Sequence, residues 1–139
     1  MYGTLDISTS GMIAQRDRLA AISANIANRH SVAADGTPYR ARTVRLAVGD
    51  PSATTPEGRG LGVHIASIEE DRSAFGLRWD PGNPFAMKEG PQAGYVLESN
   101  VNPVVEQINA MQASRAYEAN VAAAEATKTM MAQALRLLA

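Results

Sequence analysis

The chain has 139 residues, enough for one ordinary domain, but it contains few of the large side chains that usually fill a core. Hydrophobic residues make up 45% of the sequence and aromatic residues only 5%, since alanine supplies much of the apolar content. A formal net charge of −1 without a long basic run argues against a nucleic-acid or anionic-membrane binder. The absence of cysteine excludes disulfides, thiolate metal sites and a cysteine nucleophile. A neutral protein partner suits this composition best.

An amphipathic helix is predicted for residues 4–28. Its apolar stripe recurs at intervals of seven residues, with one further residue beside it, and consists of Leu5, Met12, Leu19, Ile26 and Ile22. Thr4 or Ser8 is expected to cap the start of this helix by accepting backbone hydrogen bonds. Charged residues at 16–18 interrupt the apolar positions, so the segment lacks the pattern of a secretory signal. The chain also has no run of about 18 apolar residues, so no membrane span is expected.

Residues 31–100 differ in composition and are predicted to form a small β-rich insert. Six of the seven prolines and nine of the eleven glycines lie here, between short apolar runs. Alternation of apolar with other residues predicts three short strands, at 44–48, 61–65 and 75–79. A flexible loop is expected at 51–60, and a turn at 80–84.

A second, longer helix is predicted from about residue 101 to residue 138. Its first apolar stripe consists of Val101, Val104, Ile108 and Met111. A second, heptad-like stripe consists of Tyr117, Val121, Ala124, Lys128, Met131, Leu135 and Leu138. Such a helix extends about 57 Å at 1.5 Å per residue, which is longer than a domain of this size covers. The first helix is too short to cover both stripes, so apolar surface remains for neighbouring chains.

These elements predict a mainly α fold with a small β insert. The two terminal helices are expected to pair as an antiparallel coiled coil, with the β-rich region between them in sequence. Residues 1–30 and 101–139 then form a helical assembly domain, and residues 31–100 form the insert.

Several short motifs follow one another along the chain. Asn25-Ile26-Ala27-Asn28 ends the first predicted helix, and Gly36-Thr37-Pro38-Tyr39 closes the loop after it. The later motifs are Asp80-Pro81-Gly82-Asn83-Pro84, Gly94-Tyr95-Val96, Asn100-Val101-Asn102 and the run from Ala113 to Val121, followed by Lys128. Together they resemble the flagellar axial proteins, and most of all the proximal-rod family of the FlgC type. Several motifs in one order, over nearly the whole chain, are much less expected by chance than any one motif.

The resemblance implies a structural, non-enzymatic subunit of the bacterial flagellar rod, with no cofactor. Such a subunit polymerises through its terminal helices into a torque-transmitting drive shaft, after export from the cytoplasm by the flagellar type III apparatus. The implied location is the basal body, where the rod crosses the periplasm, and the implied partners are other rod subunits and copies of this chain. The stripes and motifs nominate as subunit-interface residues Leu5, Met12, Leu19, Ile22, Asn25, Ile26, Asn28, Val104, Ile108, Met111, Arg115, Tyr117, Asn120, Val121, Met131, Leu135 and Leu138.

Some alternatives stay open at the level of sequence. The amides of Asn25 and Asn28 suit either helix termination or subunit contact. Arg115, Tyr117 and Asn120 suit either solvent exposure or hydrogen bonding between subunits. A helical binding adaptor that does not polymerise is the main alternative function, because apolar stripes indicate contact but not its repetition.

Candidate chemistry in the sequence is weak. The two histidines, His30 and His64, lie on different segments and have no metal-ligand spacing. The acidic run at 69–71 is expected to be a solvated turn rather than an acid-base pair. The sequence therefore predicts neither a metal site nor a catalytic site.

Overall fold

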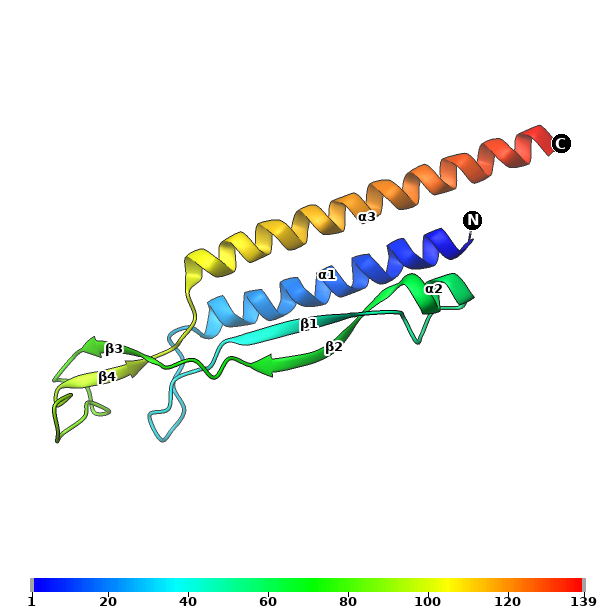
Figure 1. Ribbon diagram of the computed structural model, residues 1–139. Helices are drawn as coiled ribbons and strands as arrows, with labels where there is room; N and C mark the ends of the chain where they lie inside the picture. The colour runs from blue at the N-terminus through cyan, green and yellow to red at the C-terminus, as the bar shows by residue number, and fades with distance from the viewer. Residues whose placement is uncertain (1, 139) are drawn as a thin grey trace.

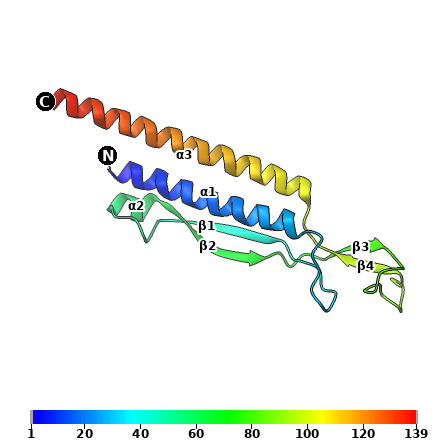
Figure 2. The same ribbon diagram turned by 180° about the vertical axis from the view of Figure 1, so that it is seen from behind.

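The computed structural model describes residues 2–138, which form an elongated, layered molecule (Figure 1). Helix α3 (Pro103–Leu138) lies along helix α1 (Tyr2–Asn28), and the two helices run antiparallel. A β-hairpin covers the other side of α1, so α1 is the middle layer in both views (Figures 1 and 2). The predicted fold class, with long paired terminal helices and a small β insert between them, is therefore confirmed.

Two separate antiparallel sheets of two strands each connect the helices. Strand β1 (Arg42–Val48) pairs with β2 (Val63–Glu70), and the short helix α2 (Pro56–Leu61) lies between these strands in the chain. Strand β3 (Gly76–Trp79) pairs with β4 (Tyr95–Glu98) at the end of the molecule opposite α2 (Figure 1).

Several details differ from the prediction, and the strand expected at 61–65 begins only at Val63, because Leu61 ends α2. The segment 51–60, expected to be a flexible loop, contains most of α2, whose N-cap Thr55 accepts a hydrogen bond from Gly58 N at 3.1 Å. Strand β4 was missed because four residues in a glycine- and proline-rich stretch give too short an alternation. Thr4 and Ser8 lie inside α1 rather than at its start, so neither is the predicted cap.

Small side chains line the contact between α1 and α3, which we call the seam. On α3, Ala113 is 0% exposed and Ala124 8%, and α1 is the element that packs against this helix. A Cβ atom added to Gly11 would lie 2.7 Å from Nδ2 of Asn120, so a larger residue at this position would force a shift of α3 or of the amide. Residues without long side chains therefore set how closely the two helices approach.

The heptad-like stripe at residues 117–138 does not coincide with the face of α3 that packs on α1. Ala124 is buried, but Lys128 and Leu135 are exposed, and Thr127 is buried instead. The contact positions are shifted because α3 meets α1 through alanine and short polar side chains, which a search for large apolar residues does not mark.

Helix α3 extends beyond the amino end of α1 (Figure 1). Gly11 lies against Asn120 and Asn25 against Glu106, an antiparallel register that puts Tyr2 level with about residue 129. Residues 130–138, which we call the overhang, therefore project roughly 13 Å past α1 at 1.5 Å per residue.

Ala113→Leu is expected to lower the free energy of unfolding by about 1–3 kcal/mol, because a fully buried seam has no room for the added carbon atoms. Ala122→Leu, on the exposed side of the same helix, is the matched control and should change it by less than about 0.5 kcal/mol. Urea unfolding of the purified chain, followed by circular dichroism, measures both values. Equal effects of the two substitutions would contradict the seam.

Candidate functional site

Asn25 joins the carboxyl end of α1 to the start of β1. Its Oδ1 accepts hydrogen bonds from Arg42 N at 2.8 Å and from the Tyr39 hydroxyl at 3.1 Å, and its Nδ2 donates to Arg42 O at 2.9 Å. The residue is 1% exposed. Leaving a buried donor or acceptor unpaired costs about 1–3 kcal/mol, so this amide specifies how β1 leaves the helix.

Asn100, just before α3, makes a similar connection one residue earlier in the same segment. Its Oδ1 accepts a hydrogen bond from Ala41 N at 2.8 Å, and its Nδ2 donates to Asp71 O at 2.9 Å and Ser73 Oγ at 3.0 Å. Ala41 O accepts from Asp71 N at 2.7 Å. The backbone of Ala41 is thereby bonded both to the approach to α3 and to the residue after β2.

Asn25 and Asn100 together form what we call the asparagine clamp, because they grip the consecutive residues 41 and 42. The clamp holds the end of α1, the start of β1 and the approach to α3 together. Arg40 braces the same place, since its Nη1 donates to Asp71 O at 3.1 Å and its guanidinium carbon lies 4.1 Å from the centroid of the Phe75 ring. Motif residues far apart in sequence therefore converge in space.

Glu106 lies in the first turn of α3, close to Asn25 and Arg18 of α1. Burial raises the pKa of this carboxyl, while a hydrogen bond with Asn25 and the charge of Arg18 act in the opposite direction. Polar contacts therefore accompany the clamp where α3 begins beside α1.

Asn28 follows the helix-termination alternative. Its Nδ2 donates to Ala24 O at 2.9 Å, and its Oδ1 accepts a hydrogen bond from Ser31 Oγ at 3.3 Å. The side-chain amide of Asn25 instead forms hydrogen bonds with the backbone of Arg42, in another segment of the same chain. Neither side chain needs a second subunit to satisfy its hydrogen bonds.

A further polar contact attaches α2 and β2 to the amino-terminal half of α1. Oδ2 of Asp6 accepts hydrogen bonds from Thr55 Oγ1 at 2.7 Å, Thr55 N at 3.0 Å and Thr54 Oγ1 at 3.0 Å. The bond from the Thr55 hydroxyl is the main cause that lowers the pKa of Asp6 below its usual value of 3.8. Ser10 Oγ accepts a hydrogen bond from Val63 N at 3.0 Å. Side-chain oxygens of α1 thus position the far end of the β1–β2 hairpin.

The predicted interface residues divide by exposure. The exposed ones are Ile26, Val104, Ile108, Met111, Arg115, Tyr117 and Leu135. The half-buried ones are Leu5, Met12, Leu19, Asn28, Asn120, Val121 and Met131. Ile22 and Asn25 are buried within the chain, so their side chains are not available to a second subunit at the surface. The side chain of Leu138 lies outside the described part.

The structure separates the three polar and aromatic motif residues of α3. Asn120 packs against Gly11 and donates from Nδ2 to Ala116 O at 2.8 Å. Arg115 is exposed and lies about 200° around the helix from Tyr117. The three side chains therefore do not form one patch, although they are close in sequence.

Other large apolar residues are also exposed, although the predicted stripes and motifs do not include them. On the helices these are Tyr2, Ile13, Val105, Met130 and Leu137, and in the insert they include Val32, Leu46, Val48, Leu61, Ile68, Leu77, Trp79 and Phe85. Most lie outside a regular stripe or on strands that the sequence alone cannot orient. Their one signal in the sequence is that they are large apolar residues which belong to none of the predicted stripes.

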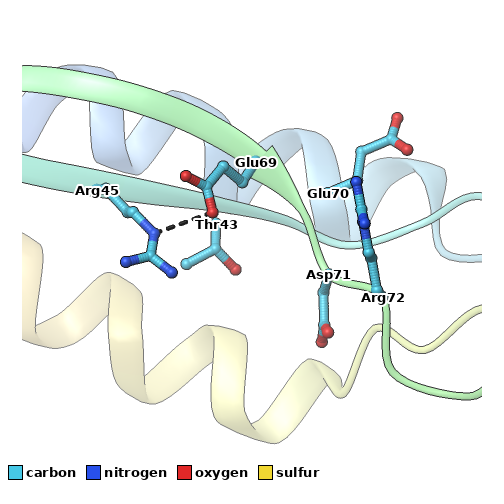
Figure 3. Close-up of a pocket in the computed structure, with 6 residues that line it drawn as sticks. All are labelled: Thr43, Arg45, Glu69, Glu70, Asp71 and Arg72. Carbon is cyan, nitrogen blue, oxygen red and sulfur yellow. Dashed lines mark hydrogen bonds and ion pairs between the residues drawn. The ribbon is translucent and has the colours of Figure 1, made fainter.

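A polar groove of about 640 Å³ opens along β1 and the end of β2 (Figure 3). It is lined by Thr43, Arg45, Glu69, Glu70, Asp71 and Arg72. Arg45 Nε donates to Glu69 Oε2 at 2.9 Å. The hydrogen bond from the Ser67 hydroxyl lowers the pKa of Glu69 most, and the bond from Arg45 lowers it further. Glu69 and Glu70 end β2 rather than forming the predicted turn.

Within residues 2–138 no group of acidic and histidine side chains is arranged to hold a metal ion. None of the described helices is long and apolar enough to cross a membrane.

Two family models match the ends of the chain. The model described as "Flagella basal body rod protein" matches residues 5–29, and that described as "Flagellar basal body rod FlgEFG protein C-terminal" matches residues 92–137. These matches cover most of α1 and of α3, and they contain both asparagines of the clamp. The two matches, at the paired terminal helices, mark the chain as a protein of the flagellar basal-body rod class.

Relatives that align over nearly the whole length place it more narrowly. The flagellar basal-body rod protein FlgC of Salmonella typhimurium is 40% identical over 99% of this chain and 97% of its own length. The FlgC protein of Borreliella burgdorferi is 38% identical over 99% of this chain and 97% of its own length. The FlgC protein of Bacillus subtilis is 34% identical over 98% of this chain and 97% of its own length. The chain belongs to the FlgC family. It is a structural subunit of the flagellar rod and not an enzyme.

Asp6→Asn is expected to release α2 from α1. Because the folded-state pKa of Asp6 is lowered, its contribution to docking is present above the usual pKa of 3.8 and is lost as the pH falls below it. The NMR amide signals of Thr55 and Gly58 should move toward unstructured positions in the wild-type chain on acidification, and already at neutral pH in Asp6→Asn.

Asp35→Asn is the matched control for this experiment. The pKa of Asp35 is also lowered, mainly by the Thr37 backbone N–H, but Asp35 lies in a separate turn. This substitution should leave the Thr55 and Gly58 signals unchanged. A structured α2 in Asp6→Asn at neutral pH would show that docking does not depend on the carboxylate.

Proposed function

We propose that this rod subunit polymerises through its two terminal helices, packing against copies of itself and against other rod subunits, so that the assembled rod transmits motor torque. One observation supports this most strongly: the chain buries mainly small side chains and exposes large ones. Its buried apolar residues, within the described part, are Ala14, Ile22, Ala41, Val96, Val101, Ala113 and Ala124. A core that is mainly alanine removes little apolar surface from water.

The first stripe of α3 is the strongest candidate contact. Val104, Ile108 and Met111 are 62%, 51% and 56% exposed, whereas Val101 at the start of the stripe is buried. Complete burial of such side chains stabilises by about 1.5–3 kcal/mol each, before the cost of association is subtracted. Three of them on one face therefore favour a partner that lies along the helix.

The division of the chain into domains follows the contrast between apolar helices and a more polar insert. We assign residues 1–30 and 101–139 to the rod wall and residues 31–100 to an outward-facing insert. The apolar stripes of the helices support the first part, and the polar groove on β1 and β2 supports the second. The clamp then lies at the boundary between wall and insert.

Membership of the FlgC family supports a further step, in which the flagellar type III apparatus exports the chain from the cytoplasm before it assembles in the periplasm. A thin core is suited to such passage, since little buried apolar surface has to be exposed when the chain unfolds.

Ile108→Asp is expected to reduce the subunit retained in purified basal bodies at least about tenfold, because an unpaired buried charge costs several kcal/mol and each 1.4 kcal/mol is a factor of ten. Quantitative immunoblotting of basal bodies and of the secreted fraction measures retention and export separately.

Gln107→Asp provides the matched control, because this exposed neighbour is a polar residue at the edge of the apolar stripe and receives the same charge. It should be retained like the wild type. Normal retention and motility with Ile108→Asp would remove the stripe from the subunit contacts.

A further inference from the structure

Strands β3 and β4 and the turn between them, residues 76–98, form a unit that we call the arm. In both views the arm projects beyond the carboxyl end of α1 (Figures 1 and 2). Among the described residues it packs extensively on none of the helices and not on the β1–β2 hairpin. Two short passages of chain, 71–75 and 99–102, join it to β2 and to α3. The orientation of the arm therefore depends on contacts near these passages.

The arm is well connected internally. The centroid of the Trp79 ring lies 5.0 Å from that of Tyr95 at an interplanar angle of 71°. A Cβ atom added to Gly94 would come within 2.6 Å of the same ring, so the glycine lets the backbone lie directly against the indole. Asp80 N donates to Gly94 O at 3.0 Å, and Met87 N donates to Tyr95 O at 2.9 Å, which bonds the turn to β4. These contacts make the arm one body.

Beside the two passages, side-chain hydrogen bonds replace apolar packing. Asn100 bonds one passage to the other, because its Nδ2 donates to Asp71 O at 2.9 Å and to Ser73 Oγ at 3.0 Å. Its Oδ1 accepts a hydrogen bond from Ala41 N at 2.8 Å, at the start of the β1–β2 hairpin. Arg40 Nη1 donates to Ser73 O at 3.2 Å. A few polar bonds, most of them to Asn100, thus fix the angle between the arm and this hairpin.

The arm is loosely packed where it meets the loop that follows α1. Phe85 touches this loop at Gly36, where an added Cβ atom would lie 2.6 Å from the phenyl ring. Two cavities remain between the loop and the arm. The larger, of about 330 Å³, lies between residues 35–37 and 84–88, and the smaller, of about 250 Å³, lies between residues 29–32 and 96–99. A close-packed boundary leaves no such space, so the arm has room to move here.

We propose that the arm pivots as one body at the passages 71–75 and 99–102, and that the hydrogen bonds of Asn100 set its resting angle. Short passages between rigid bodies are where backbone rotation is absorbed in hinge motions. A few bonds also open at much lower cost than a packed core does. Leu77 and Trp79, which are 44% and 60% exposed, then change direction relative to the paired helices. This inference concerns a single chain and does not depend on the proposed polymerisation.

A distance measurement between two spin labels tests the pivot. Because the chain contains no cysteine, Val48→Cys on β1 and Leu77→Cys on β3 provide the two attachment sites, one on each side of the pivot. Pulsed electron paramagnetic resonance of the purified chain gives the distribution of distances between them. Asn100→Ala is expected to broaden this distribution at least about twofold, because the arm loses its bonds to Ala41 and Asp71.

Asn102→Ala is the matched control. Oδ1 of this neighbouring asparagine accepts a hydrogen bond from Val104 N at 3.0 Å, so the substitution removes a helix cap and none of the bonds of Asn100. It should leave the distance distribution unchanged. An unchanged width in Asn100→Ala, or equal broadening in both variants, would overturn the pivot.

A second measurement separates pivoting from unfolding of the arm. Trp79 is the only tryptophan of the chain, so its indole N–H gives one NMR signal that reports the contact with Tyr95. This signal should keep its position in Asn100→Ala, because the contact lies within the arm. Movement toward the position of an unstructured tryptophan would show that the arm unfolds, and would overturn the proposal.

Arg40→Gln decides the matter if Asn100→Ala does not fold. This variant keeps Asn100 and removes the bonds that Arg40 donates to Asp71 O and Ser73 O. It should also broaden the distance distribution while the Trp79 signal stays in place. An unchanged width would count against the pivot, whereas the proposed function is read separately from the retention of Ile108→Asp in basal bodies.

Discussion

The close approach of α1 and α3 is the contact on which the rest of the structure depends. Glycine and alanine let the two helices approach closely, as the fit of Asn120 against Gly11 illustrates. Such a seam gains little from the hydrophobic effect, because alanine has little surface to bury. The large apolar residues are consequently displaced to the outside of the helices. The narrow seam and the apolar exterior are two aspects of one arrangement.

The asparagine clamp compensates for what the seam lacks in specificity. Apolar contacts between small residues tolerate sliding, whereas Asn25 and Asn100 bond to defined peptide groups of neighbouring residues. Asp6 and Ser10 do the same at the other end of α1. The middle helix is therefore tied at both ends through side chain to backbone hydrogen bonds, which set the direction of the β1–β2 hairpin relative to the helices.

Periodicity was sufficient to find the two long helices and the approximate positions of three strands, because both signals are local and extend over many residues. It could not find the phase of the seam, since Thr127 and the alanines of α3 do not stand out as apolar positions.

The role of Asn25 was equally hidden, because its partners are fourteen and seventeen residues away and belong to a loop and a strand. The motifs nevertheless pointed to the right family, and three of their residues, Asn25, Tyr39 and Asn100, make such long-range bonds. Helix α2 was missed because its glycines resemble a loop, although one of them, Gly58, allows it to lie close to Asp6 of α1.

The position of the two long helices has a consequence for the order in which the subunit folds. Helix α1 is made first and α3 last, yet each is the main partner of the other. Contacts between the ends of a chain have high contact order, so the seam forms only after the whole insert has been synthesised. During that interval α1 has only the β1–β2 hairpin to pack against, and its seam face is open. The seam face of α1 is thus left uncovered until α3 has been made.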